Sequence, residues 1–274
     1  MALPDHSYVV CSTQRSGSTY LCQLLASTGV AGNPQEYFEA TAQTGLPPHP
    51  GFFLDGLPRR AAGVRDDDRP GDAPEYSDLT LVGDWGAHLG RTRRLGTTAN
   101  GVFATKLMWN QLPEVEHYAD TVPRLAGLRG YELLERLFDG PGYVWIRRQD
   151  KVRQAISLWR ALQTRTWRLE RQAVNGGASG LKYNFDAIEH LRVRLTAEDA
   201  SWGRFFTESG AEPLELHYEE DVEPDPVGAV RKVLAHIGIG LPAAWAPATA
   251  MVRQSDERTD VWQATYDRDA AARL

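Results

Sequence analysis

A loop rich in anion-binding groups lies close to the N-terminus, in the run Thr13-Gln14-Arg15-Ser16-Gly17-Ser18-Thr19. A β-rich run over 7–12 predicts a strand before it, and the leucine spacing over 18–28 predicts a helix after it. Gly17 permits a tight turn, so that backbone N–H groups and the start of the helix can surround an anion. Arg15 adds a cation, and the hydroxyls of Ser16, Ser18 and Thr19 add further donors. We therefore expect a phosphate or sulfate group to bind here.

The same run differs from the phosphate loop of nucleoside triphosphatases, whose pattern is G-x-x-x-x-G-K-[ST]. Counting back from Ser18, Gly17 stands where the lysine of that pattern belongs, and Ser12 or Thr13 stands where its first glycine belongs. No acidic residue ends the next predicted strand to help hold magnesium. A divergent P-loop small-molecule kinase, which would need ATP and magnesium, is therefore the alternative interpretation.

A second candidate anion site follows the strand predicted over 142–147. Arg147 and Arg148 lie where that strand ends, and Ser157 follows two turns into the next predicted helix. Ligands of parallel α/β sheets gather at the carboxyl ends of strands, and an arginine fork with a hydroxyl can hold a phosphate. Strand alternation leaves open which arginine faces the site. A surface arginine paired with Asp150 is the other interpretation.

Strands alternate with helices along the rest of the chain. Strands are predicted over 7–12, 101–108, 142–147 and 213–218, and helices over 18–28, 128–138, 150–171, 185–209, 226–237 and 255–272. This alternation predicts an α/β fold with a central parallel sheet flanked by helices. We expect the 274 residues to form a single domain over 1–274. A proline-rich stretch within it predicts an irregular loop at about 41–100, which is either a lid over an acceptor site or a surface insertion.

The overall composition excludes several classes of protein. Apolar residues make up 42% and charged residues 24% of the chain, as in a globular protein with a core, and the net charge of −6 argues against nucleic-acid and anionic-membrane partners. We find no signal-peptide pattern and no apolar run long enough for a membrane span. Cys11 and Cys22 are expected to be free thiols in a reducing cytoplasm, and nothing suggests a metal site.

Several stretches spread along the chain together resemble the Stf0 family of sulfotransferases. They are Gln14-Arg-Ser-Gly-Ser-Thr19, Val30-Ala-Gly-Asn-Pro-Gln-Glu-Tyr-Phe38, Lys106-Leu-Met-Trp-Asn-Gln111, Gln154-Ala-Ile-Ser-Leu-Trp-Arg-Ala161, Gln163-Thr-Arg165, and Arg253-Gln-Ser-Asp256 with Trp262. The resemblance implies a P-loop-like sulfotransferase fold that uses PAPS (3′-phosphoadenosine-5′-phosphosulfate) as donor, releases PAP and needs no metal. It also implies a small-molecule acceptor and a homodimer.

The resemblance further implies which residues hold the donor. They are Arg15, Ser16, Gly17, Ser18, Thr19, Arg148, Ser157 and Arg253. Within this set, Arg148 and Ser157 are expected on the 3′-phosphate. Taken from the residues alone, Arg253 could equally be a solvated arginine in front of a helix.

Sulfuryl transfer to a hydroxyl also needs a general base. Other sulfotransferases use a histidine on the strand after the phosphate loop, but this chain has Met108 in the matching place, and methionine cannot accept a proton. The resemblance assigns the base to Glu36, with Lys106 and Arg15 supporting the charge of the transferring group. Pro34 and the flanking aromatic residues are expected to hold Glu36 in a partly apolar cleft that raises its pKa. Glu39 is the nearest competitor.

Acceptor binding is implied for one segment and a few positions around it. The residues are Gln14, Asn33, Pro34, Gln35, Glu36, Tyr37, Phe38, Glu39, Pro48 and Phe53. The last is a departure, because the family pattern has tryptophan there, and the segment itself differs from that pattern at several places. An aromatic platform with amide donors still suits a polyhydroxylated molecule. A sugar, a glycoside or glycolipid precursor and a hydroxylated natural product all stay open as acceptors.

Overall fold

The computed structural model describes residues 6–39, 53–54, 56–57, 84–164, 180–247 and 257–273. These residues fall into two compact units. The first contains 6–39, 84–149 and 198–247, and the second contains 53–54, 56–57, 150–164, 180–197 and 257–273. The single domain expected over 1–274 stays a prediction.

A four-stranded parallel sheet forms the centre of the first unit. Its strands are β1 (His6–Ser12), β2 (Val102–Met108), β3 (Gly142–Arg147) and β4 (Leu214–His217), in the order β2-β1-β3-β4. All three pairings are parallel. The sheet therefore confirms the predicted α/β class. Since the chain passes from β1 to β2 and then crosses to β3, strand order reverses beside β1, which is where such sheets bind ligands.

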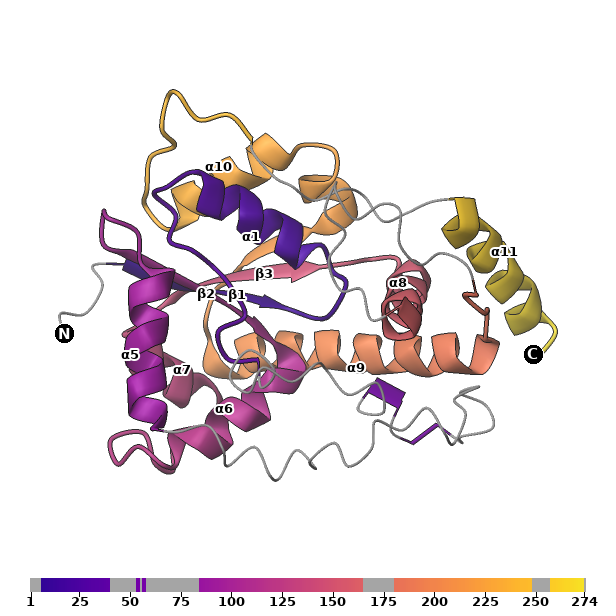
Figure 1. The fold of residues 1–274 in the computed structure, drawn as a ribbon, viewed down its shortest axis with the longest axis horizontal. Helices are drawn as coiled ribbons and strands as arrows, with labels where there is room; N and C mark the ends of the chain where they lie inside the picture. The colour runs from indigo at the N-terminus through magenta and orange to yellow at the C-terminus, as the bar shows by residue number, and fades with distance from the viewer. Residues whose placement is uncertain are drawn as a thin grey trace. The chain divides into compact units, whose positions relative to one another are not determined.

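One face of this sheet is covered by α1 (Ser18–Ser27) and α10 (Pro226–His236) (Figure 1). Side chains that alternate along β1 decide which residues lie on this face, so Tyr8 and Val10 pack with the leucines of α1. The valines of α10 complete the same buried cluster. This packing fixes the start of α1, and therefore the loop in front of it, against the sheet.

The opposite face is covered by α5 (Trp85–Gly96), α6 (Leu112–Ala119), α7 (Gly130–Phe138) and the C-terminal part of α9 (Phe185–Ser209). Val9 and Cys11 of β1 point into this second cluster, which is rich in aromatic rings. The two cysteines lie on opposite faces of the sheet, and both are buried free thiols, as expected. The sheet is thus the middle of three layers, which holds its carboxyl edge in place.

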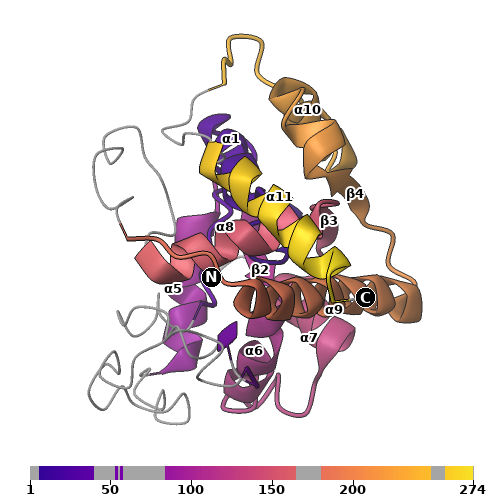
Figure 2. The same cartoon turned by 90° about the vertical axis from the view of Figure 1, so that its right-hand side faces the viewer.

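The second unit is helical. Helix α8 (Lys151–Thr164) lies beside α11 (Glu257–Ala271), and both pack with the N-terminal part of α9 (Figure 2). Phe53 and Leu54 belong to the same buried cluster. None of the described helices is long and apolar enough to cross a membrane.

The structure corrects the predicted elements at three places. The irregular loop expected up to about residue 100 gives way to α5, which begins after Asp84 because that carboxylate accepts the backbone N–H groups of Gly86 and Ala87. Helix α6 and the 3₁₀ turn η3 (Trp109–Gln111) were not predicted at all. Strand β4 continues into a π-helical turn, η5 (Tyr218–Val222), where only a strand end was expected.

Candidate active site

The run 13–19, which joins β1 to the start of α1 and is called the phosphate loop below, has the backbone of an anion-binding nest. Arg15 and Gly17 both adopt left-handed conformations, with φ of 61° and 89°, and alternation of this kind turns successive N–H groups toward one side. No acidic residue lies in the first turn of α1, so the positive end of the helix faces this loop uncompensated. The Oγ of Ser16 is buried and has no hydrogen-bond partner among the described residues. A buried hydroxyl without a partner is costly unless a ligand supplies one.

Gly17 is required for a second reason, which sequence inspection did not reveal. A β-carbon at this position would lie 2.1 Å from a ring carbon of Tyr218. Tyr218 begins the π-helical turn after β4, so an element far along the chain packs directly on the phosphate loop. Turns of this type are frequent at functional sites. In the sequence, this contact was indicated by nothing more than an aromatic residue, Tyr218, at the end of the strand predicted over 213–218.

Arg148 is directed toward the phosphate loop. Its Nη1 donates a hydrogen bond to the carbonyl of Arg15 at 3.2 Å, and its guanidinium lies 5.3 Å from the ring centre of Tyr218. Its buried Nε makes no hydrogen bond with any described residue, although Glu219 lies 3.5 Å away. The guanidinium can therefore offer a donor to a ligand beside the loop.

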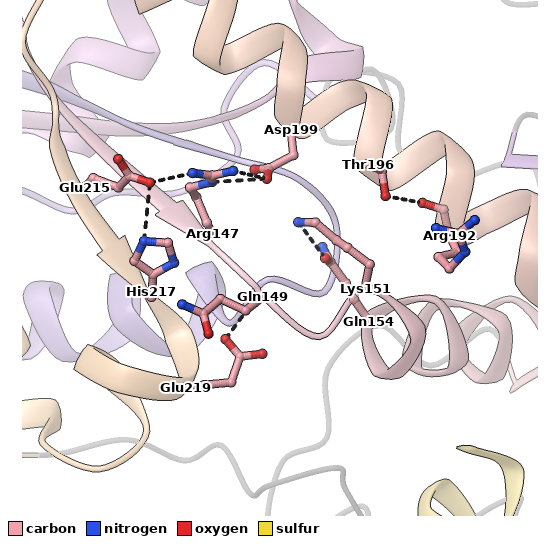
Figure 3. A network of polar contacts seen from close by, with 10 residues as sticks. All are labelled: Arg147, Gln149, Lys151, Gln154, Arg192, Thr196, Asp199, Glu215, His217 and Glu219. Carbon is pink, nitrogen blue, oxygen red and sulfur yellow. Dashed lines mark hydrogen bonds and ion pairs between the residues drawn. The ribbon is translucent and has the colours of Figure 1, made fainter. Parts of the chain in front are cut away.

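Arg147 is held by two carboxylates. It bonds to Asp199 of α9 at 3.0 Å and to Glu215 of β4 at 2.6 Å, as Figure 3 shows. The guanidinium also stacks 4.3 Å from the ring centre of Trp145. Of the two arginines that the sequence left open, Arg148 is thus the one that bonds to the phosphate loop, while Arg147 ties β3 to β4 and α9.

Glu36 and Lys106 form an ion pair, with 2.6 Å between Oε1 and Nζ. The side chain of Lys106 is 2% exposed and that of Glu36 16%, so little water screens the pair. The same ammonium donates to Oγ1 of Thr19 at 2.8 Å. One lysine on β2 therefore contacts both the candidate base and the phosphate loop.

The second oxygen of Glu36 accepts a hydrogen bond from Nε2 of Gln111 at 3.0 Å. A cation and an amide thus hold the two oxygens of this carboxylate separately. The partly apolar cleft expected around Glu36 stays a prediction, and the structure adds these two polar contacts to it. Gln111 lies in a stretch used for the resemblance, but nothing in the sequence pattern assigned it a contact with Glu36.

The segment 33–39, which the sequence predicts to bind the acceptor and which is called the acceptor segment below, is fixed to the sheet mainly through its backbone. The carbonyl of Gln35 accepts the N–H of Lys106 at 2.9 Å, and the N–H of Asn33 bonds to Gly96 at the end of α5. Burial raises the pKa of Tyr37 to about 12, so its phenol is protonated and donates to the carbonyl of Asn33 at 2.8 Å. Nε2 of His88, on α5, lies 2.9 Å from the carbonyl of Tyr37. The segment is therefore positioned independently of any ligand.

Comparison with known proteins now decides the family. The model of the Stf0 sulphotransferase family matches residues 7–269. A trehalose 2-sulfotransferase of Mycolicibacterium smegmatis is 35% identical over 277 aligned positions, which cover 98% of this chain and 97% of the relative. A trehalose 2-sulfotransferase of Mycobacterium tuberculosis is 34% identical, with 96% and 95% covered.

This chain belongs to the Stf0 sulfotransferase family. It is accordingly a sulfotransferase, and the kinase interpretation falls away. The resemblance that rested on scattered motifs is confirmed over nearly the whole length.

Other predicted site residues of this Stf0 sulfotransferase divide into four groups. Gln14 lies beside the η3 turn, because its Nε2 donates to Oδ1 of Asn110 in that turn. Pro34 is buried and Glu39 partly buried within the acceptor segment, whereas Phe38 packs edge-on against Phe138 in the core. Ser157 and Phe53 belong to the second unit, and Pro48 and Arg253 lie outside the described residues.

The position of Met108 agrees with its inability to act as a base in this sulfotransferase. It ends β2 in a buried site, and its sulfur accepts a hydrogen bond from the hydroxyl of Ser12 at 3.0 Å. Met108 is therefore not a candidate for the base.

Within the described ranges, no group of three or more His, Cys, Asp or Glu side chains is arranged to hold a metal.

Proposed function

We propose that the protein transfers the sulfuryl group of PAPS to a hydroxyl of a small acceptor, a sugar, glycoside or hydroxylated natural product. The observation that carries the proposal is Lys106, which bonds to Glu36 at 2.6 Å and to Thr19 at 2.8 Å. It joins a proton acceptor to a loop built for an anion. The names of the two relatives favour a carbohydrate acceptor.

The groups around the phosphate loop fit a nucleotide that carries anionic groups at two ends. The nest at Arg15 and Gly17, the buried Ser16 hydroxyl and the start of α1 would hold the phosphosulfate end. Arg148, whose guanidinium lies beside this loop, would hold the 3′-phosphate. Ser157 and Arg253 keep the roles that the family resemblance implies, as further proposed contacts. When bound, PAPS supplies a sulfur atom whose bond to the phosphate oxygen can break.

In this proposal Glu36 takes the proton of the acceptor hydroxyl. The acceptor oxygen forms the new bond to sulfur while the old sulfur–oxygen bond breaks, and the electron pair of that bond leaves on PAP. Lys106 and Arg15 offset the negative charge of the transferring oxygens. Because the Lys106 ammonium already contacts Glu36, the cation lies where both proton removal and charge stabilisation require it.

Replacing Arg148 tests the nucleotide site. Wild-type protein should bind PAP much more tightly than AMP, and Arg148→Ala should remove most of that difference, a loss of roughly 1.5–3 kcal/mol for a charged hydrogen bond. Isothermal titration measures both ligands. Arg147→Ala is the matched control: it should lower the melting temperature, because Asp199 is buried and loses its cation, but keep the PAP-to-AMP ratio. Equal affinity of the wild type for PAP and AMP would overturn the assignment.

Removal of divalent metal separates sulfuryl from phosphoryl transfer. The loop lacks the lysine of triphosphatases, and we expect turnover with PAPS to continue at an unchanged rate in EDTA. The measurement is the initial rate with and without chelator, with added magnesium as the control. A strict magnesium requirement would contradict a metal-free mechanism.

We further propose that the protein is a homodimer, supported by the family resemblance, and that it is cytoplasmic, supported by its two buried free thiols. Light scattering on the purified protein measures the mass in solution. A particle of one 30.5 kDa chain at micromolar concentration would contradict the dimer.

A further inference from the structure

Gln111 makes two hydrogen bonds that leave its amide a single orientation. It ends the η3 turn directly after β2, and its side chain is buried. Its Oε1 accepts the backbone N–H of Met108 at 3.0 Å, while its Nε2 donates to Oε2 of Glu36 at 3.0 Å. A backbone N–H can only donate, so the amide oxygen must face Met108 and the NH₂ group must face Glu36.

The carboxylate of Glu36 is therefore held at both ends. Lys106 contacts Oε1 and Gln111 contacts Oε2, and both partners come from β2 or the turn that follows it. The plane of the carboxylate is thus set by two donors on one short piece of chain. Neither the Lys106 ammonium nor the Gln111 NH₂ group can accept a hydrogen bond from a protonated Glu36, so both contacts favour the charged form that acts as a base.

We propose that Gln111 is a positioning residue that orients Glu36 and keeps it ready to accept the acceptor's proton. This inference rests on the proposed role of Glu36 as base, and it adds a residue to which neither the motifs nor the family resemblance gave a role. Gln111 acts through Glu36.

Gln111→Glu is the sharpest test, because it keeps the length and the acceptor for the Met108 N–H but replaces the donor facing Glu36 with a second carboxyl. We expect kcat to fall by about 10–100-fold, the cost of a misplaced reacting group. The acid limb of the pH–rate profile should move to higher pH, since two adjacent carboxyls hold a proton more tightly than one. The Kd for PAP should stay within a few fold.

Other groups near Glu36 must be separated from this effect. Lys106 faces Glu36 from β2, and Glu39 lies three residues along the same segment. Burial, together with the charge of Glu39, raises the pKa of Glu114 on α6 to about 7, so this group titrates near neutral pH and can add a limb of its own to a pH–rate profile. Glu114→Gln is therefore the control, and it should leave the acid limb where it is.

A double-mutant cycle with Glu36→Gln shows whether Gln111 acts through Glu36. If it does, Gln111→Glu should reduce kcat by less than about threefold in the Glu36→Gln background, because there is no base left to position. Effects that multiply fully would overturn the proposal. The proposal would also be overturned if Gln111→Glu kept the wild-type kcat and the wild-type acid limb while Glu36→Gln was impaired.

The result also separates this proposal from the proposed function. Near-normal kcat in Glu36→Gln would remove the base itself, and the role of Gln111 with it, whereas loss of PAP binding in the wild type would remove the nucleotide site. Melting temperatures check that each variant is folded. If Gln111→Glu does not fold, Gln111→Met, which is uncharged and cannot donate, must show the same direction of change in kcat and in the acid limb.

Discussion

Glu36→Gln is expected to lower kcat by about 10²–10⁴-fold, the usual contribution of a general base. Glutamine keeps the size of the side chain but cannot take a proton at neutral pH. The wild-type rate should fall on the acid side as Glu36 becomes protonated, and the variant should lack this limb. The measurement is kcat as a function of pH with saturating PAPS.

The controls for this variant follow from its contacts. The nucleotide is proposed to bind at other residues, so the Kd for PAP should change by no more than a few fold. The melting temperature should fall, because the buried ammonium of Lys106 loses its counter-ion. Glu39→Gln is the matched carboxylate control. If Glu36→Gln kept near-normal kcat and Glu39→Gln did not, the base would be Glu39.

Lys106→Met is expected to lower kcat by about 10²–10³-fold, comparable to the loss of one preorganised charge-stabilising donor. Methionine replaces most of the apolar stem and lacks only the volume of the ammonium, so the buried site stays largely filled. Unlike Glu36→Gln, this variant should also weaken PAP binding, because Lys106 contacts Thr19 of the phosphate loop. Steady-state kinetics together with titration of PAP measure the two effects.

Lys232→Met provides the comparison for a lysine whose ion pair is largely exposed. Lys232 bonds to Asp221 at 2.5 Å, but its side chain is 55% exposed, and such pairs contribute little. Its kcat and PAP affinity should match the wild type. A folded Lys106→Met protein with wild-type kcat would remove Lys106 from the mechanism.

The elements that position the site could be predicted because their signals are local. The β-rich runs and the glycine after the first strand specify β1, the loop and α1 without reference to the rest of the chain. Helix α5 was not predicted, because the contacts that stabilise it are not local. It contains Gly86 and Gly90, which disfavour a helix, and it forms because Trp85 and Leu89 are buried against the sheet.

The sequence alone does not decide whether Arg147 or Arg148 lies beside the phosphate loop. Both follow the same strand, and neither its alternation nor its composition distinguishes them. The structure distinguishes them through Asp199 and Glu215, which come from an unrelated helix and strand and bind Arg147. Gln111 is similar, because its partner Glu36 lies in a different segment. Contacts between distant segments depend on tertiary packing, which periodicity does not encode.

The contact between Gly17 and Tyr218 has a consequence for how the protein matures. The phosphate loop is made early in synthesis, but the tyrosine against which it packs emerges from the ribosome only after β4. Strand β1 also cannot pair until β2 and β3 have been made, because its residue His6 pairs with Val102 and its residue Tyr8 with Gly142. Such non-local pairing slows folding. A nascent or truncated chain should therefore be unable to bind nucleotide before β4 has been added. Added PAP would then favour the completed fold by mass action.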